Sequence, residues 1–147
     1  GTFPTFDGRT MSARLKILVI DDEAEICELT KLLLQRNGHE VLVATNGNVA
    51  IRLFNEQPFD LVITDILMPD CDGLEVIAEL RRKHPAVRII ASSGGGRVSS
   101  DSYLHIARKT GAHALLAKPF TLTELHSSIA AAMQGAEPVT PATEPAN

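Results

Sequence analysis

A chain of 147 residues has room for one domain of ordinary size, which excludes a multidomain enzyme. Hydrophobic residues make up 44% of the chain and charged residues 22%, a globular composition that excludes a wholly disordered protein. The formal net charge of -4 gives no broad cationic field for a phosphate backbone, so direct nucleic-acid binding is not expected. The cysteines lack CxxC spacing and no apolar run approaches the ~20 residues of a membrane span, so we expect a cytoplasmic protein without disulfides or membrane contact.

The two ends of the chain differ in composition from its middle. Residues 1–13 mix Gly, Pro, Thr and Phe without a period, and we interpret them as a disordered segment that is not native up to residue 10, because Met11 is a plausible start. Residues 135–147 are rich in proline and small residues and are expected to be a disordered tail or a truncated linker. The remaining residues, 14–134, are predicted to form one domain.

Between these ends, short apolar runs alternate with amphipathic stretches of helical length, the pattern of repeated βα units. The run at 16–20 is continuously apolar, which is typical of a parallel strand buried on both faces. In chain order the pattern predicts strand 16–20, helix 23–37, strand 41–44, a helix between Asn46 and Pro58, strand 61–64, helix 74–83, strand 87–91, helix 102–110, strand 114–117 and a last helix to about Met133, opened by a capping box of Thr121 and Glu124. Strands joined by helices are parallel, so we predict an α/β fold: an open five-stranded parallel sheet with helices on both faces.

Polar residues that can carry chemistry follow four of the predicted strands. Asp21 and Asp22 come after the first strand, Asp65 after the third, Ser93 after the fourth and Lys118 after the fifth. Because the carboxyl ends of parallel strands meet at one edge of a sheet, these side chains are expected to converge. Clustered carboxylates favour a hard cation such as Mg²⁺, while a lysine and a hydroxyl suit an anion beside it. The pattern therefore points to a metal site next to a bound anion, such as a phosphoryl group on Asp65.

Four motifs in this order resemble the receiver domains of two-component response regulators. They are LVIDDE around Asp21 and Asp22, ITDILMPDCDG around Asp65, IIASSG around Ser93 and LLAKPF around Lys118. The resemblance spans about residues 14–133 and implies the flavodoxin-like (βα)5 receiver fold, with strand order 2-1-3-4-5. It also implies a phosphoprotein of bacterial phosphorelay signalling.

The resemblance implies a role for each residue that would meet the phosphoryl group. Asp65 would be the phosphoacceptor, Lys118 would bind a phosphoryl oxygen, and Ser93 would move to hydrogen-bond another as part of the switch. Leu115 stands at the second switch position, where receivers often carry an aromatic residue, so the aromatic readout is not expected in its usual form. In this family the lysine is commonly followed by a cis peptide bond, here to Pro119.

The resemblance also implies a metal cofactor, Mg²⁺ or Mn²⁺. Asp22 and Asp65 would ligate the ion directly, together with the backbone carbonyl of Leu67. Asp21 would act mainly through water. No other cofactor is implied.

The function that follows from the resemblance is phosphoryl transfer from a sensor histidine kinase or a histidine phosphotransfer protein, which switches a partner-binding surface. The chain is expected to catalyse only its own phosphorylation and a slow autodephosphorylation, so it is not predicted to be an enzyme. The output would lie in an unknown partner or in a missing C-terminal output domain, and a homodimer stays an open option. Alternatives are a stand-alone phosphate shuttle, an unphosphorylated binding module and, least favoured, a phosphohydrolase, for which Asp70 and Asp72 supply a DxD spacing.

The histidines show neither metal-ligand spacing nor a phosphodonor context. They are therefore expected at the surface or at the edges of the fold; they are His39, His84, His105, His113 and His126. Cys27 lies among apolar neighbours of the first predicted helix and is expected to be a small packing residue.

Overall fold

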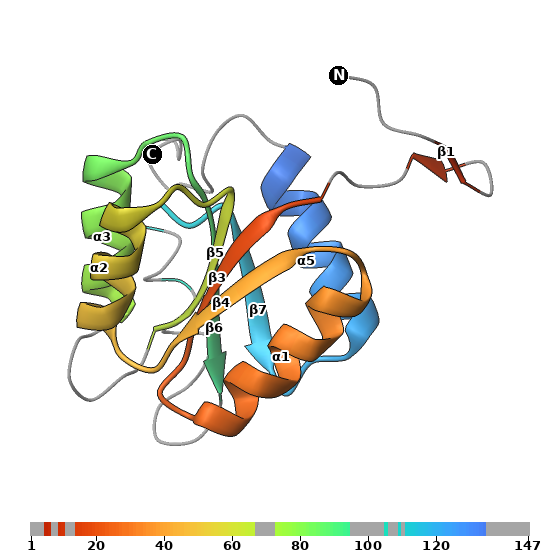
Figure 1. The fold of residues 1–147 in the computed structure, drawn as a ribbon, viewed down its shortest axis with the longest axis horizontal. Coiled ribbons are helices and arrows are strands. Elements are labelled where there is room, and N and C mark those ends of the chain that lie inside the picture. The colour runs from red at the N-terminus through yellow and green to blue at the C-terminus, as the bar shows by residue number, and fades with distance from the viewer. Residues whose placement is uncertain are drawn as a thin grey trace.

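The computed structural model describes residues 5–6, 9–10, 14–66, 73–94, 105, 109 and 111–134. Five of the described strands form one parallel sheet (Figure 1); they are β3 (Lys16–Ile20), β4 (Glu40–Ala44), β5 (Leu61–Asp65), β6 (Arg88–Gly94) and β7 (Ala114–Lys118). Their order across the sheet is β4-β3-β5-β6-β7, and every neighbouring pair is parallel. In sequence order of these strands this is 2-1-3-4-5, so the predicted fold and strand order are confirmed.

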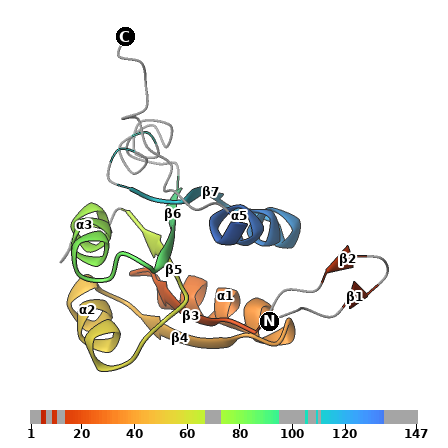
Figure 2. The same cartoon turned by 90° about the horizontal axis from the view of Figure 1, so that it is seen from above.

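The described helices cover both faces of the sheet. They are α1 (Ala24–Arg36), α2 (Gly47–Glu56), α3 (Gly73–Lys83) and α5 (Leu122–Gln134). Figure 2 shows α1 and α5 on one face and α2 and α3 on the other. The predicted helix 102–110 lies largely outside the described residues. None of the described helices has the length and apolar content that a membrane span requires.

Local signals explain where these helices begin and end. The side chain of Asn46 accepts a hydrogen bond from the backbone N–H of Val49 at 2.9 Å, which caps α2. At α5, the predicted capping box is confirmed, because Thr121 and Glu124 exchange side-chain to backbone hydrogen bonds of 2.9 and 3.0 Å. Gly38 has a φ of 90°, the left-handed conformation expected just after α1.

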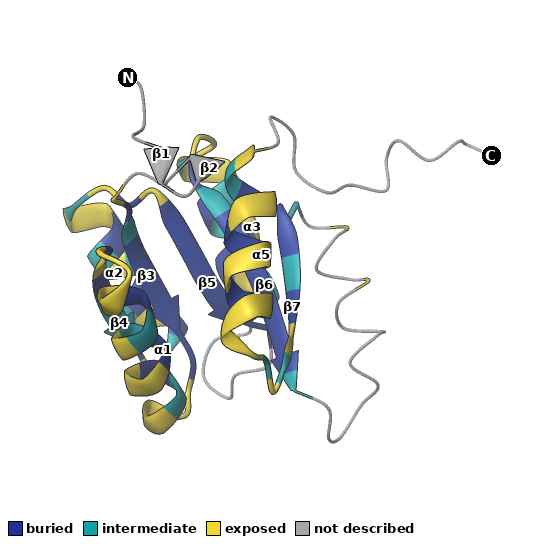
Figure 3. Cartoon of the chain, turned by 90° about the vertical axis from the view of Figure 1, so that its right-hand side faces the viewer, coloured by how far each residue is buried: buried dark blue, intermediate teal, exposed yellow. Residues whose placement is uncertain are grey.

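The strands of the sheet are largely buried (Figure 3). The alternation of their side chains divides the core into two clusters, one on each face of the sheet. Ile17 and Val19 of β3 pack on the α1 and α5 side, whereas Leu18 and Ile20 pack on the α2 and α3 side. Full burial of each such side chain stabilises the fold by about 1.5–3 kcal/mol. The same alternation determines on which face of the sheet the side chain that ends each strand lies. Cys27 is buried in the α1 and α5 side of the core, as expected of a packing residue.

Strand β6 differs from its prediction. The apolar run predicted a strand over 87–91, whereas β6 spans Arg88–Gly94 and includes both serines, Ser92 and Ser93. The strand continues because β5 and β7 flank it: Ser92 pairs with Asp65 and Ser93 pairs with Ala117. The ladder satisfies the backbone there, from both sides at Ser92 and from β7 at Ser93 and Gly94, whatever the hydropathy of the side chains.

Residues 1–13 were expected to lack structure. Within them, β1 (Thr5–Phe6) and β2 (Arg9–Thr10) pair as an antiparallel two-stranded sheet, and the other residues of this segment lie outside the described ones. The sequence between the two strands is Asp-Gly, a pair typical of hairpins.

Two of the five histidines lie at edges of the sheet, as expected, but they are buried rather than at the surface. His39 and His113 are 8% and 7% exposed, and each immediately precedes a strand of the sheet. The Nδ1 atom of His39 accepts a hydrogen bond from the N–H of Leu15 at 3.1 Å, and that of His113 accepts one from the N–H of Ile89 at 3.0 Å. Each imidazole thus satisfies a buried backbone donor, which lies just before β3 for His39 and within β6 for His113.

Candidate functional site

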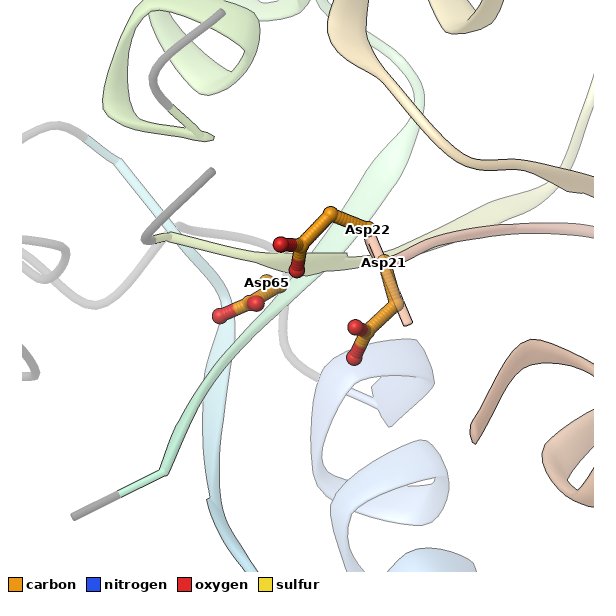
Figure 4. Close-up of side chains that lie close together, drawn as sticks. All are labelled: Asp21, Asp22 and Asp65. Carbon is orange, nitrogen blue, oxygen red and sulfur yellow. The ribbon is translucent and has the colours of Figure 1, made fainter. Parts of the chain in front are cut away.

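Three carboxylates meet at the carboxyl edge of the sheet (Figure 4). Asp21 and Asp22 directly follow β3, and Asp65 is the last residue of β5. One carboxylate oxygen from each residue lies within 4.8 Å of the other two. Asp21 and Asp65 are 4% and 5% exposed, whereas Asp22 is open to solvent. The convergence expected from the strand ends is therefore present.

Backbone hydrogen bonds hold these residues in place. The N–H of Asp21 donates to the carbonyl of Ala44 at 3.1 Å, so the ladder between β3 and β4 extends to the first carboxylate. In the same way, the N–H of Ile66 donates to the carbonyl of Ser92 at 2.9 Å and extends the ladder beyond Asp65. The Asp21 carboxylate accepts a hydrogen bond from the N–H of Glu23 at 2.9 Å, which links the site to the start of α1.

Lys118 brings a positive charge into the cluster. Its Nζ atom donates a hydrogen bond to Asp21 Oδ2 at 2.8 Å and lies 3.5 Å from Asp65 Oδ2. Burial alone would lower the pKa of Lys118, but the hydrogen bond to Asp21 and the charges of Asp21, Asp65 and Glu23 outweigh it and raise the pKa above 10.5. Lys118 therefore stays charged at neutral pH. Its peptide bond to Pro119 is cis, as the resemblance implies.

The charge balance and the donor set of the cluster fit a divalent cation. Three carboxylates and one ammonium group leave two negative charges in excess. The carboxylate groups offer only oxygen ligands, which Mg²⁺ prefers in proteins. The residues present can therefore hold a hard divalent ion. Leu67, the expected source of a backbone ligand, lies outside the described residues.

The predicted switch residues lie on β6 and β7. Ser93 is buried, and its hydroxyl donates to the carbonyl of Gly94 at 3.4 Å. Since Asp65 pairs with Ser92, the side chain of Ser93 lies on the opposite face of the sheet from that of Asp65. Leu115 is half-buried and packs against the core on the α2 and α3 side.

Gly73, the first residue of α3, is a site residue that sequence reasoning missed. A Cβ atom built on Gly73 would lie 2.0 Å from the backbone carbonyl oxygen of Asp65 and 2.4 Å from Cα of Ile66. Real Cβ atoms essentially never come closer than 3.0 Å to another heavy atom, so only glycine lets α3 start against the end of β5. The signal that could have indicated this close approach is the glycine directly before the predicted helix 74–83.

The fold agrees with comparisons to known proteins. The sequence model of the response regulator receiver domain matches residues 17–130. The chain belongs to this family of receiver domains, which act in two-component signalling. Receiver domains of this family are generally not enzymes in their own right.

One curated relative is the alkaline phosphatase synthesis transcriptional regulatory protein PhoP of Bacillus subtilis (strain 168). It is 30% identical over 132 residues, which are 90% of this chain and 54% of that protein. The chain thus spans about half the length of this relative.

Several solved structures share the fold. A response regulator receiver domain protein from Clostridium thermocellum is 38% identical with a TM-score of 0.72, over 80% of this chain and 93% of that chain. The response regulator TrrA from Thermotoga maritima, in complex with Mg²⁺ and BeF, is 36% identical with a TM-score of 0.69, over 78% of this chain and 96% of that chain. NtrX from Brucella abortus is 29% identical with a TM-score of 0.76, over 82% of this chain and 27% of that chain.

Proposed function

We propose that this receiver domain accepts a phosphoryl group on Asp65 from the phosphohistidine of a sensor histidine kinase or a histidine phosphotransfer protein. The observation that carries the proposal is the buried Asp65 carboxylate with the Lys118 ammonium group 3.5 Å away. An oxygen of Asp65 forms the new bond to phosphorus as the phosphorus–nitrogen bond of the donor breaks. The donor imidazole keeps that electron pair and takes a proton from water.

The residues around Asp65 neutralise charge rather than form bonds. Phosphoryl transfer depends mainly on alignment and on stabilisation of the equatorial oxygens. Lys118 binds one of these oxygens, and its hydrogen bond to Asp21 holds the ammonium group beside Asp65 before the donor arrives. Ser93 donates to a second phosphoryl oxygen, which requires its hydroxyl to leave the carbonyl of Gly94 and to reach the phosphoryl group beyond the end of β5 from the opposite face of the sheet. This movement, together with Leu115 on the neighbouring strand, forms the switch.

Mg²⁺, or Mn²⁺, would be held by Asp22 and Asp65 directly, by the backbone carbonyl of Leu67, and by Asp21 mainly through water. When bound, the ion supplies positive charge to the phosphoryl oxygens. The two excess negative charges of the cluster support this assignment.

The receiver domain is assigned to residues 14–134, with 1–13 and 135–147 outside it. The assignment is supported by the family match at 17–130. We further propose a cytoplasmic protein with slow autodephosphorylation. Its output lies in a partner or in a further domain, in keeping with the greater length of PhoP and NtrX.

Incubation with acetyl phosphate and Mg²⁺ is expected to add one phosphoryl group to the protein, detected by intact-mass spectrometry. Asp65→Asn removes the acceptor oxygen and is expected to abolish the gain. Asp60→Asn is the matched control: it is the same substitution just before the other end of β5, where the carboxylate accepts a hydrogen bond from the backbone N–H of Lys16 at 2.8 Å. Asp60→Asn should be phosphorylated like the wild type. No gain in the wild type, or an equal gain in Asp65→Asn, would contradict the proposal.

Asp22→Asn is expected to weaken Mg²⁺ binding by at least about tenfold, because it removes a charged oxygen ligand from the cluster. The affinity can be measured by titrating Mg²⁺ and following backbone amide signals by NMR. Glu25→Gln on α1 removes the same charge from a nearby exposed position outside the cluster and should leave the affinity close to that of the wild type. If both substitutions weaken Mg²⁺ binding equally, Asp22 acts only through its negative charge and not as a ligand.

A further inference from the structure

Ser92 carries a buried hydroxyl that no described group satisfies. The residue is 4% exposed, and its Oγ atom has no hydrogen-bond partner among the described residues. Folded proteins rarely leave a buried donor unpaired, because the group has lost its bonds to water. We therefore expect the Ser92 hydroxyl to form a hydrogen bond in another state of the protein.

The register of the sheet places Ser92 beside the phosphoryl acceptor. Ser92 pairs with Asp65 on one side and with Leu116 on the other, and residues paired in this way share a face of the sheet. That face is the α1 and α5 side, because Ile63 and Ile90, two positions earlier on the same strands, pack there. Neighbouring strands lie about 4.8 Å apart, so the Ser92 hydroxyl is one strand spacing from the Asp65 side chain.

Lys118 crosses this face just beyond Ser92. It starts on β7, and its Nζ atom lies 2.8 Å from Asp21 Oδ2 and 3.5 Å from Asp65 Oδ2, so its side chain extends past the end of β6 towards the carboxylates. A Cβ atom built on Gly94, the next β6 residue on the same face as Ser92, would lie 3.6 Å from Cε of Lys118. Ser92 therefore lies between Asp65, the phosphoryl acceptor, and Lys118, whose positive charge offsets the negative charge of the Asp65 carboxylate.

We propose that Ser92 is a positioning residue of the phosphorylated site, whose hydroxyl donates a hydrogen bond to the carboxyl group of Asp65 once a phosphoryl group or its analogue is bound. The inference rests on the proposed function. In the unmodified protein the Lys118 ammonium group lies 3.5 Å from Asp65 Oδ2. A phosphoryl group draws that ammonium group towards its own oxygens. The Ser92 hydroxyl, which shares a face of the sheet with Asp65 one strand away, then donates to the carboxyl group, whereas Ser93 acts from the opposite face.

The test is a titration with beryllofluoride in the presence of Mg²⁺, followed by NMR, on the wild type and on Ser92→Ala and Ser92→Cys. Both substitutions remove the strong donor; alanine leaves slightly less side chain in the buried site and cysteine slightly more, so a loss common to both is not a packing effect. We expect both to weaken beryllofluoride binding by about tenfold, the effect of losing one hydrogen bond to a charged or polarised group. The melting temperature without beryllofluoride should stay the same or rise in Ser92→Ala, because an unpaired buried hydroxyl is removed.

Ser128→Ala is the matched control. Ser128 is also buried, but its hydroxyl donates to the carbonyl of Leu115 at 3.1 Å. Its loss should lower the melting temperature and leave beryllofluoride binding unchanged. If Ser92→Ala lowers the melting temperature and leaves beryllofluoride binding unchanged, Ser92 has only a structural role and the inference is overturned. If the wild type itself does not bind beryllofluoride, it is the proposed function that fails.

Discussion

Gly73→Ala is expected to lower the free energy of unfolding by at least about 3 kcal/mol and to disable the phosphoryl site. The added methyl group would lie 2.0 Å from the carbonyl oxygen of Asp65 and 2.4 Å from Cα of Ile66. Both are backbone atoms, so no side chain can rotate to relieve the contact. Either α3 must move away from the sheet or the end of β5 must shift, and both movements displace the acceptor.

Urea unfolding and beryllofluoride binding measure the two effects. Gly38→Ala separates a steric cause from a conformational one, because a Cβ atom on Gly38 meets nothing within 4 Å while its φ of 90° disfavours alanine. That substitution should cost only about 1–2 kcal/mol and leave binding intact. A Gly73→Ala protein that is as stable as Gly38→Ala, or that still binds beryllofluoride like the wild type, would show that α3 adapts easily.

The parts of the fold that could be predicted depend on local pattern. Continuous apolar runs such as Lys16–Ile20 predict strands buried on both faces, and helices between them require a parallel sheet. Because parallel strands end at one edge, the convergence of Asp21, Asp65 and Lys118 follows from their positions after those runs. The resemblance to receiver domains added the strand order, which hydropathy alone does not determine.

The features that could not be predicted depend on contacts between distant segments. The pairing of Ser92 with Asp65 depends on the register of β6 against β5, which a one-residue shift would reverse. The strand predicted from hydropathy also ended too early, at residue 91, because hydropathy carries no information on the ladder hydrogen bonds that flanking strands provide. The buried positions of His39 and His113 follow from backbone donors in or just before neighbouring strands, to which their own sequence context gives no clue.

Those two histidines make the fold sensitive to acid. Burial, with the charges of Arg88 and Arg81, lowers the pKa of His113 from 6.5 to about 4. Burial, with the charge of His126, lowers the pKa of His39 as well. In both cases the Nδ1 atom that accepts a backbone hydrogen bond must be unprotonated. The unfolded chain therefore binds protons first as the pH falls, and the folded state loses stability.

The free energy of unfolding is expected to be highest above about pH 6.5 and to fall as the pH drops towards 4. His113 alone should account for a loss of about 2 kcal/mol by pH 5. His39 adds a loss of the same sign. Urea unfolding at pH 7 and pH 5 measures the sum of these effects.

His113→Asn isolates the contribution of His113. The asparagine side-chain oxygen can accept the hydrogen bond from Ile89 in place of Nδ1, but it does not titrate. The variant should therefore lose about 2 kcal/mol less than the wild type between pH 7 and pH 5. His105→Gln, at an exposed histidine, should keep the slope of the wild type. If His113→Asn also keeps that slope, the imidazole is not the group that couples protonation to unfolding, and the acid sensitivity must arise from groups other than His113.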